Sequence, residues 1–151
     1  MVLICYATQS EGEVLKLKRL HLRQQLETAP ALLKLILEDF EFISRKFGIE
    51  PTLTRLTDSY KGESGVHADG RAADIRDEYM DKNTYNDTQR DAILHYINAR
   101  YPRSDNKMTI IHHSFSGGPE HFHIQIPAKQ SDIFLRSMVK AIYGEGSEGS
   151  L

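Results

Sequence analysis

The stretch Pro119-Glu120-His121-Phe122-His123-Ile124-Gln125-Ile126 alternates polar and apolar side chains from His121 onwards. In a β-strand, successive side chains point to opposite faces of the sheet. Phe122, Ile124 and Ile126 are therefore expected to face a core. His121 and His123 are expected to share the opposite face. The alternation predicts a strand over residues 121–126, in a sheet with one buried face.

The segments on either side combine helices with short strands. Apolar residues recur at spacings of three and four from residue 33 to 47, so a helix is expected from Pro30 to Phe47, with Gly48 after its end. Further helices are expected at residues 88–100, capped by Asn86 or Asp87, and at 131–143. Strands are expected at residues 2–8, 51–57, 72–75 and 108–112. Residues 13–25 fit either a helix or a strand.

This mixture predicts an α+β fold, in which a small antiparallel sheet packs against helices. The chain has 151 residues, which suits one domain, here expected over residues 1–143. Residues 144–151 are low in complexity, and we expect a flexible tail.

Composition excludes several classes of protein. Lysine and arginine number 19 and aspartate and glutamate 21, so the net charge of −2 argues against a strongly basic nucleic-acid binder. The single cysteine, Cys5, excludes an intrachain disulfide framework and a cysteine-rich zinc site. No apolar run is long enough to span a membrane, and the N-terminus lacks the basic region of a secretory signal. We therefore expect a protein made in the cytoplasm, without membrane or nucleic-acid partners.

Two clusters carry candidate catalytic groups, one at residues 65–74 and the other at residues 119–124. A catalytic zinc ion takes three protein ligands from histidine, aspartate and glutamate, and keeps a fourth position open. His67 and Asp74 can supply two ligands from either end of a turn, with His123 as the third. Glu120 then remains free as a general base, and Gly70 allows the tight turn between the first two ligands.

The string His67-Ala68-Asp69-Gly70-Arg71-Ala72-Ala73-Asp74, followed by Glu120-His121-Phe122-His123, resembles a known zinc signature. It is similar to that of the D-alanyl-D-alanine carboxypeptidase and L-alanyl-D-glutamate endopeptidase family, which has the Hedgehog/DD-peptidase fold. The resemblance spans roughly residues 30–127. It implies that His67, Asp74 and His123 bind Zn²⁺ and that Glu120 is the catalytic base.

The resemblance also implies a substrate and further site residues. The substrate would be a peptide with D-amino acids from bacterial peptidoglycan, and both a phage lysin released to the cell wall and a cytoplasmic dipeptidase fit. Arg55 matches an arginine that stabilises the substrate oxyanion. The family's serine two places before the first histidine is Gly65 here, and Ser64 is the nearest candidate for substrate contact.

Other histidines are candidates for substrate binding. His121 shares the strand face of His123 and can line the same cleft. His112 and His113 end a predicted strand beside the site, and because neighbours on a strand point to opposite faces, one of them faces the cleft. We assign that position to His113.

Three other interpretations remain open. His121-Phe122-His123 also fits the histidine pair of a single-strand nickase, with Tyr96 or Tyr143 as nucleophile, although this leaves His67 and Asp74 unexplained. A metal-binding module of the same fold that lacks catalysis is a second possibility. The third is an α+β domain whose histidines do not form a common functional site.

Overall fold

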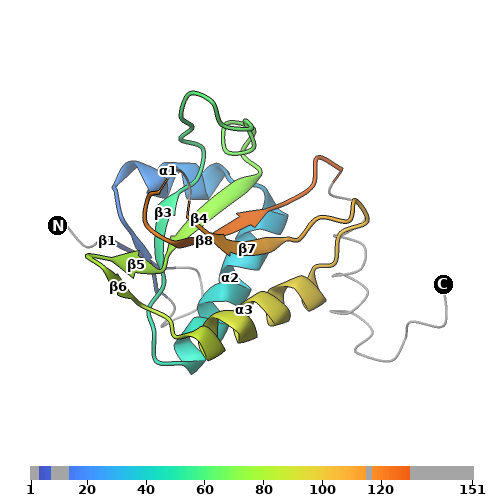
Figure 1. The fold of residues 1–151 in the computed structure, drawn as a ribbon. Coiled ribbons are helices and arrows are strands. Elements are labelled where there is room, and N and C mark those ends of the chain that lie inside the picture. Colours follow the sequence, from blue (N-terminus) through green and yellow to red (C-terminus); the bar gives the residue numbers. More distant parts are fainter. Residues whose placement is uncertain (1–3, 8–13, 115–116, 130–151) are drawn as a thin grey trace.

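A computed structural model describes residues 4–7, 14–114 and 117–129 of the chain. Six strands form one sheet in the order β1-β2-β3-β4-β8-β7 (Figure 1). Their bounds are β1 Ile4–Ala7, β2 Val14–Leu17, β3 Thr52–Arg55, β4 Ala72–Arg76, β8 His121–Gln125 and β7 Ile110–His113. The described residues also form the helices α1 His21–Thr28, α2 Ala31–Lys46 and α3 Asp87–Arg100, and a small hairpin of β5 Glu78–Tyr79 and β6 Lys82–Asn83. The expected α+β class is confirmed.

The sheet is mixed, so the expectation of an antiparallel sheet is wrong at one pairing. β2 runs parallel to β3, with Lys16 opposite Thr52 and Leu17 opposite Leu53, whereas the other four pairings in the sheet are antiparallel. Parallel neighbours need a crossover connection of a dozen or more residues. Here α1 and α2 fill that connection, between residues 17 and 52.

Residues 13–25, which fit either a helix or a strand, divide between the two. Leu15 and Leu17 are buried two residues apart on β2, whereas Leu22 and Leu26 are buried four residues apart on α1. The leucine spacing therefore changes from two to four at the boundary between the elements.

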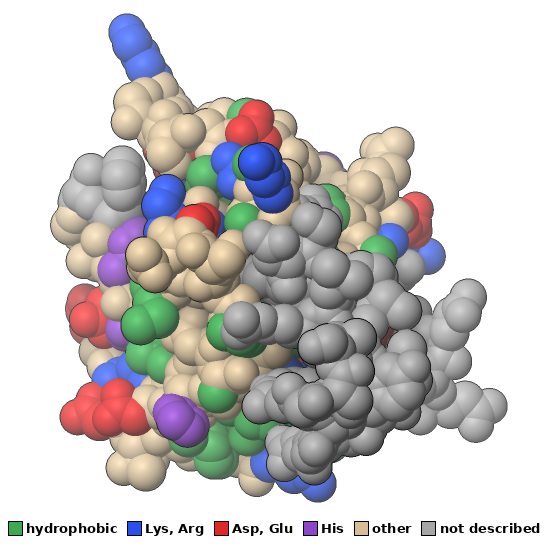
Figure 2. Space-filling view, turned by 90° about the vertical axis from the view of Figure 1, so that its right-hand side faces the viewer, with side chains coloured by type: hydrophobic (Ala, Val, Ile, Leu, Met, Phe, Trp, Pro, Cys, Tyr) green, Lys and Arg blue, Asp and Glu red, His purple; other side chains and the backbone are tan. Residues whose placement is uncertain are grey.

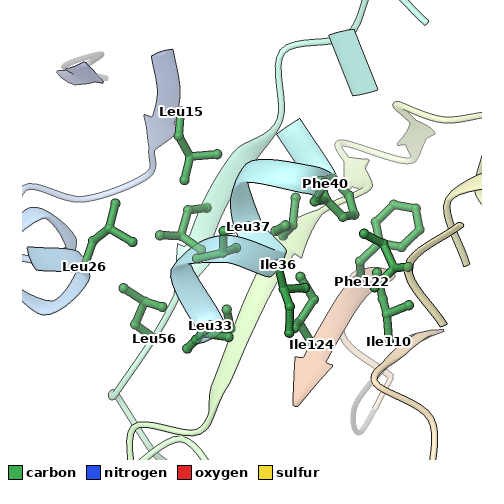
Figure 3. Packing of buried hydrophobic residues seen from close by; sticks show 14 of the residues in the cluster. Leu15, Leu26, Leu33, Ile36, Leu37, Phe40, Leu56, Ile110, Phe122 and Ile124 are labelled. Carbon is green, nitrogen blue, oxygen red and sulfur yellow. The ribbon is translucent and has the colours of Figure 1, made fainter. Parts of the chain in front are cut away.

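One core joins the three described helices to one face of the sheet. The apolar face of α2 contributes Leu33, Ile36 and Phe40 to the same core cluster as Phe122 and Ile124 of β8 (Figure 3). Phe40 meets the Phe122 ring edge-on, with 5.1 Å between the ring centroids. Ile93 and Ile97 of α3 complete the core, as their spacing predicts.

The opposite face of the sheet carries the polar residues. On β4, Ala73 and Ile75 belong to the core, while Asp74 and Arg76 alternate with them. On β8, Phe122 and Ile124 belong to the core, while His121 and His123 alternate with them. Since Asp74 pairs with His123 in the register, the two candidate ligands lie side by side on this face.

The β5–β6 hairpin has no counterpart in the sequence prediction. Its turn residues, Met80 and Asp81, both have positive φ values, of 50° and 60°. Tight hairpin turns of this kind usually contain glycine or asparagine, so a Met-Asp turn gives little signal.

Two expected features, the helix at 131–143 and the tail at 144–151, lie outside the described residues. Within the described part, no helix is both long enough and apolar enough to cross a membrane. Acidic and basic side chains are intermixed on the face shown in Figure 2, in keeping with the nearly balanced composition.

Candidate metal centre

His67 is held by a compact turn between β3 and β4. Backbone hydrogen bonds run from Asp69 N to Gly65 O and from Gly70 N to His67 O, and Gly70 has a φ of +72°. Glycine adopts this conformation without a steric penalty, as the predicted turn requires. The His67 Nδ1–H donates to the carbonyl of Leu56 at 2.6 Å, which places the lone pair that could coordinate a metal on Nε2.

Asp74 and His123 reach the same point from adjacent strands. His123 Nδ1 lies 2.8 Å from Asp74 Oδ1, and His67 Nε2 lies 3.4 Å from the same oxygen. The His67 and His123 rings are 5.2 Å apart between centroids. The two sequence clusters therefore do come together in space, as the motif predicts.

These three side chains, here called the ligand cluster, fit a metal ion. One ligand atom from each lies within 4.8 Å of the others. Ligands about 2.1 Å from a tetrahedral zinc ion are separated by about 3.4 Å. The distance from His67 Nε2 to Asp74 Oδ1 has this value, whereas His123 Nδ1 lies closer to that oxygen, at 2.8 Å. Two imidazoles and a carboxylate form a donor set typical of catalytic zinc, although other divalent ions also accept it.

A β-bulge brings Arg55 to the ligand cluster. Leu53 pairs with Ile75, but Arg55, two residues further, pairs with Asp74, only one residue away on the partner strand. Without that irregularity Arg55 would share the core-facing side of β3 with Leu53, because side chains alternate. The bulge turns the arginine to the polar face instead.

The Arg55 guanidinium bonds to three groups at once. Its Nε donates to Asp74 Oδ2 at 2.7 Å, its Nη1 to Glu63 Oε1 at 2.5 Å, and its Nη2 to His67 Nε2 at 2.8 Å. Burial opposes its charge, but the bonds to Glu63 and Asp74 more than offset this and raise the pKa of Arg55. Arg55 therefore holds two of the three candidate ligands in place.

Asp74 is a carboxylate in this environment. Burial alone would raise its pKa, but the hydrogen bond from His123 and the nearby His67 ring outweigh burial and hold the pKa of Asp74 well below its usual range. The side chain is only 6% exposed. A buried, ionised carboxylate beside two imidazoles is suited to a cation.

His121 and His113 extend the polar face beyond the ligand cluster. His121 Nδ1–H donates to Pro119 O at 3.1 Å, and its Nε2 lies 3.8 Å from Asp74 Oδ1. The His113 ring lies 4.6 Å from that of His121 and 5.6 Å from that of His123. Its Nε2 is buried and has no hydrogen-bond partner among the described residues. Burial, followed by the nearby His121 and His123, lowers the pKa of His113.

Glu120, the predicted base, lies in a different group of side chains. Its carboxylate lies near Asp77 and His112, with one ligand atom from each within 4.8 Å of the others. Asp77 is fully buried and accepts hydrogen bonds from His112 Nε2 and Arg90 Nε, each at 2.7 Å. In the described part of the chain, no hydrogen bond joins the Glu120 carboxylate to His67, Asp74 or His123.

A cavity of about 430 Å³ nevertheless has both Glu120 and one member of the ligand cluster, Asp74, on its wall. Asp74, His121, Arg55 and Glu120 all line it. Its wall includes residues that the sequence reasoning did not predict: Lys18, Arg19, Tyr60, Glu63, Arg76 and Tyr79. The position of Arg76 could have been found by extending the strand predicted at residues 72–75 by one residue, because Arg76 then shares the face of Asp74.

Two other predicted residues lie elsewhere. Ser64 is exposed and does not line the cavity. Tyr96, a proposed nickase nucleophile, packs on α3 against the core, on the opposite side of the sheet from His121 and His123, and Tyr143 lies outside the described residues.

Comparisons with known proteins give no family assignment. No protein-family model, curated protein or solved structure matches the chain.

Proposed function

We propose that this chain is a zinc-dependent peptidase of the Hedgehog/DD-peptidase fold that cleaves bacterial cell-wall peptides containing D-amino acids. The observation that carries the proposal is the convergence of His67, Asp74 and His123 from one loop and two strands, with their ligand atoms within 4.8 Å. The cavity beside them also contains an unliganded carboxylate, that of Glu120.

The ligand cluster would hold the ion through His67 Nε2, Asp74 and His123. When bound, zinc supplies a Lewis acid that polarises a peptide carbonyl and lowers the pKa of a water molecule to about 7. His123 can coordinate through Nδ1, with its proton on Nε2, which lies 3.4 Å from Gln125 Oε1. The Leu56 carbonyl fixes the His67 tautomer in the same way.

Glu120 would act as general base and then as general acid. Its carboxylate takes a proton from the attacking water as the new C–O bond forms, and returns the proton to the leaving amine as the C–N bond breaks. For this step, side-chain rotation has to move the carboxylate from Asp77 and His112 towards the ligand cluster. The position of Glu120 on the cavity wall supports this movement.

Arg55 would stabilise the negative charge on the carbonyl oxygen in the transition state. Its Nη2 now donates to His67 Nε2, the atom that would coordinate the ion. In the metal-bound protein this donor would therefore be available to the substrate, while Nε and Nη1 keep their hydrogen bonds to Asp74 and Glu63. A preorganised cation at this point lowers the barrier to attack.

The test is digestion of purified cell-wall peptides with and without a chelator, read by mass spectrometry. We expect cleavage that stops on chelation and returns with zinc. Glu120→Gln should keep about one zinc ion per chain and lose at least about 100-fold in rate. His67→Ala should lose the metal, and an unchanged zinc content in that variant would contradict the ligand assignment.

A non-catalytic metal-binding module is the second candidate. The grouping of the Glu120 carboxylate with Asp77 and His112, rather than with the ligand cluster, favours it. This alternative predicts stoichiometric zinc with no cleavage of any cell-wall peptide.

A further inference from the structure

Asp77, His112 and Glu120, here called the second cluster, come from three adjacent segments of the sheet. Asp77 follows β4, His112 lies on β7, and Glu120 precedes β8. Arg76 pairs with His121 in the register, so the next pair of this antiparallel ladder brings Asp77 opposite Glu120. One ligand atom from each of the three side chains lies within 4.8 Å of the others.

The second cluster is distinct from the ligand cluster. Side chains alternate along a strand, so Asp77 continues the core-facing side of Ile75, and His112 shares the side of Ile110. The His112 ring meets the core residue Phe122 edge-on, with 5.0 Å between the ring centroids. The ligand cluster lies on the opposite face of the sheet, so these side chains form a separate set of possible ligands.

The Glu120 carboxylate has a fixed backbone but no bonding partner in the described part of the chain. The Glu120 N–H donates to Glu78 Oε2 at 3.2 Å, and the Glu78 N–H donates to the Glu120 carbonyl at 3.0 Å. Among residues 4–7, 14–114 and 117–129, no hydrogen bond or ion pair reaches the Glu120 carboxylate. It nevertheless lies beside the carboxylate of Asp77. A cation between the two carboxylates would relieve their repulsion, and His112 adds a nitrogen ligand.

The Asp77 carboxylate is already oriented by its hydrogen bonds. Its Oδ1 accepts from the backbone N–H groups of Thr84 and Tyr85, at 3.1 and 2.9 Å. Its Oδ2 accepts from Arg90 Nε and His112 Nε2, each at 2.7 Å. The bonds from Thr84, Tyr85 and Arg90 hold the carboxylate as outer-shell groups hold a metal ligand. A cation would take the place of the His112 Nε2 proton, between Nε2 and Oδ2, and that proton would leave to solvent.

The position of the arginine makes the second cluster the weaker of the two sites. At Asp74, the Arg55 Nε bonds to Oδ2, whereas His123 approaches the other oxygen, Oδ1. At Asp77, the arginine and the histidine share Oδ2, so a cation on this oxygen would lie next to a guanidinium. Repulsion between the two positive charges should lower the affinity at least about 100-fold relative to the ligand cluster.

We propose that the second cluster is a second cation site, which takes a transition-series divalent ion such as Zn²⁺ when the ion is in excess. Imidazole and carboxylate groups together suit zinc and its neighbours in the series. The consequence for catalysis rests on the proposed peptidase function. A bound cation would hold the Glu120 carboxylate beside Asp77 and His112, where it cannot act as the general base, so excess zinc should inhibit cleavage.

Calorimetric titration of the metal-free protein with zinc alone tests the second site without any peptide. We expect two binding events, the second at least about 100-fold weaker than the first. In His112→Gln the second event should weaken by more than about tenfold, because a glutamine amide can still donate to Asp77 but is a poor zinc ligand. The first event should be retained.

A second variant and a control make the titration independent of core packing. Glu120 is half-buried, and Glu120→Gln should also weaken the second event by more than about tenfold while it keeps the first. The matched control is His95→Gln, on the exposed side of α3, which should keep both events.

Inhibition by zinc tests the effect on Glu120. The rate of cell-wall peptide cleavage should rise as zinc fills the ligand cluster and fall again at the concentrations that fill the second cluster. Half-inhibition should require more than about tenfold more zinc in His112→Gln than in the wild type. His95→Gln should follow the wild-type curve.

A single binding event in the wild-type protein would overturn the second site, as would a second event that is unchanged in His112→Gln and Glu120→Gln. If the peptide is cleaved but zinc inhibition is absent, or is the same in His112→Gln, the capture of Glu120 is wrong. A protein that cleaves no cell-wall peptide contradicts the proposed function. Two binding events, with the second weakened in both variants, would support the second site even then.

Discussion

At the scale of single residues, Asp74 is the most constrained group of the candidate metal centre. Its carboxylate accepts hydrogen bonds from Arg55 and His123 while almost fully buried. Asp74→Asn keeps the shape but removes the charge. We expect a larger loss of zinc affinity than the roughly 10–100-fold that follows loss of an outer-shell partner. A competition titration with a chromophoric chelator measures it.

The matched control is Asp69→Asn, in the loop that precedes β4. The Asp69 side chain is 61% exposed and pairs with Arg71 at 3.3 Å. The zinc affinity of the Asp69→Asn variant should equal that of the unmodified protein. Wild-type affinity in Asp74→Asn would remove Asp74 from the ligand cluster.

Asp74 should also govern the acid sensitivity of the metal-free protein. Because the pKa of Asp74 is lower in the folded chain than in the unfolded chain, the charged carboxylate stabilises the fold above about pH 4. That contribution declines as the pH falls from about 4 towards the folded-state pKa. Over this window the free energy of unfolding of the wild-type protein should fall with decreasing pH more steeply than that of Asp74→Asn. The difference in slope should be up to about 1.4 kcal/mol per pH unit. Urea denaturation at pH 4 and pH 3 tests the difference, and parallel slopes would contradict it.

At the scale of elements, Asp77 connects the end of β4 to three neighbours. It accepts hydrogen bonds from Tyr85 N after the hairpin, Arg90 Nε of α3 and His112 Nε2 of β7. Asp77→Ala would leave the Arg90 guanidinium, whose side chain is 13% exposed, without this partner. We expect a loss of about 3–5 kcal/mol in the free energy of unfolding. Urea denaturation measures it.

Asp87→Ala gives the control for that network. Asp87 also pairs with Arg90, but its side chain is 94% exposed. Its removal should cost less than about 1 kcal/mol. If the two variants lose equal stability, burial of the Asp77 network contributes nothing to the fold.

The periodicity of single segments predicted α2, α3 and β8 well, because each of these elements has one apolar face. It could not predict that β2 runs parallel to β3, since pairing direction depends on the path of α1 and α2 between them. Nor could it predict the bulge at Arg55, which arises from the register between two strands. The proximity of the ligand cluster was predictable because its motif places His67 and Asp74 at either end of one turn. The positions of Lys18 and Arg19 on the cavity wall could not be predicted, because they depend on the pairing of β2 with β3 in the tertiary fold.

At the scale of the whole molecule, the two faces of the sheet have different roles: one belongs to the core that stabilises the fold, and the other carries the candidate functional residues. One face packs on the helices, and the other carries the ligand cluster, Arg55 and Arg76. Variants on the polar face should therefore change metal and ligand binding without emptying space in the core. This separation makes the binding tests above interpretable.

Metal binding should nevertheless stabilise the entire fold, because the candidate ligands come from the loop before β4, from β4 and from β8. Free zinc at 100 times its Kd adds about 2.7 kcal/mol if only the folded chain binds it. For a chain of this size, that raises Tm by about 5–10 °C over the chelator-treated protein. Scanning calorimetry should show this shift in the wild type and in His95→Ala, whose histidine is exposed on α3, but not in His123→Ala. If His123→Ala keeps the full shift, the stabilising ion is bound somewhere other than at the ligand cluster.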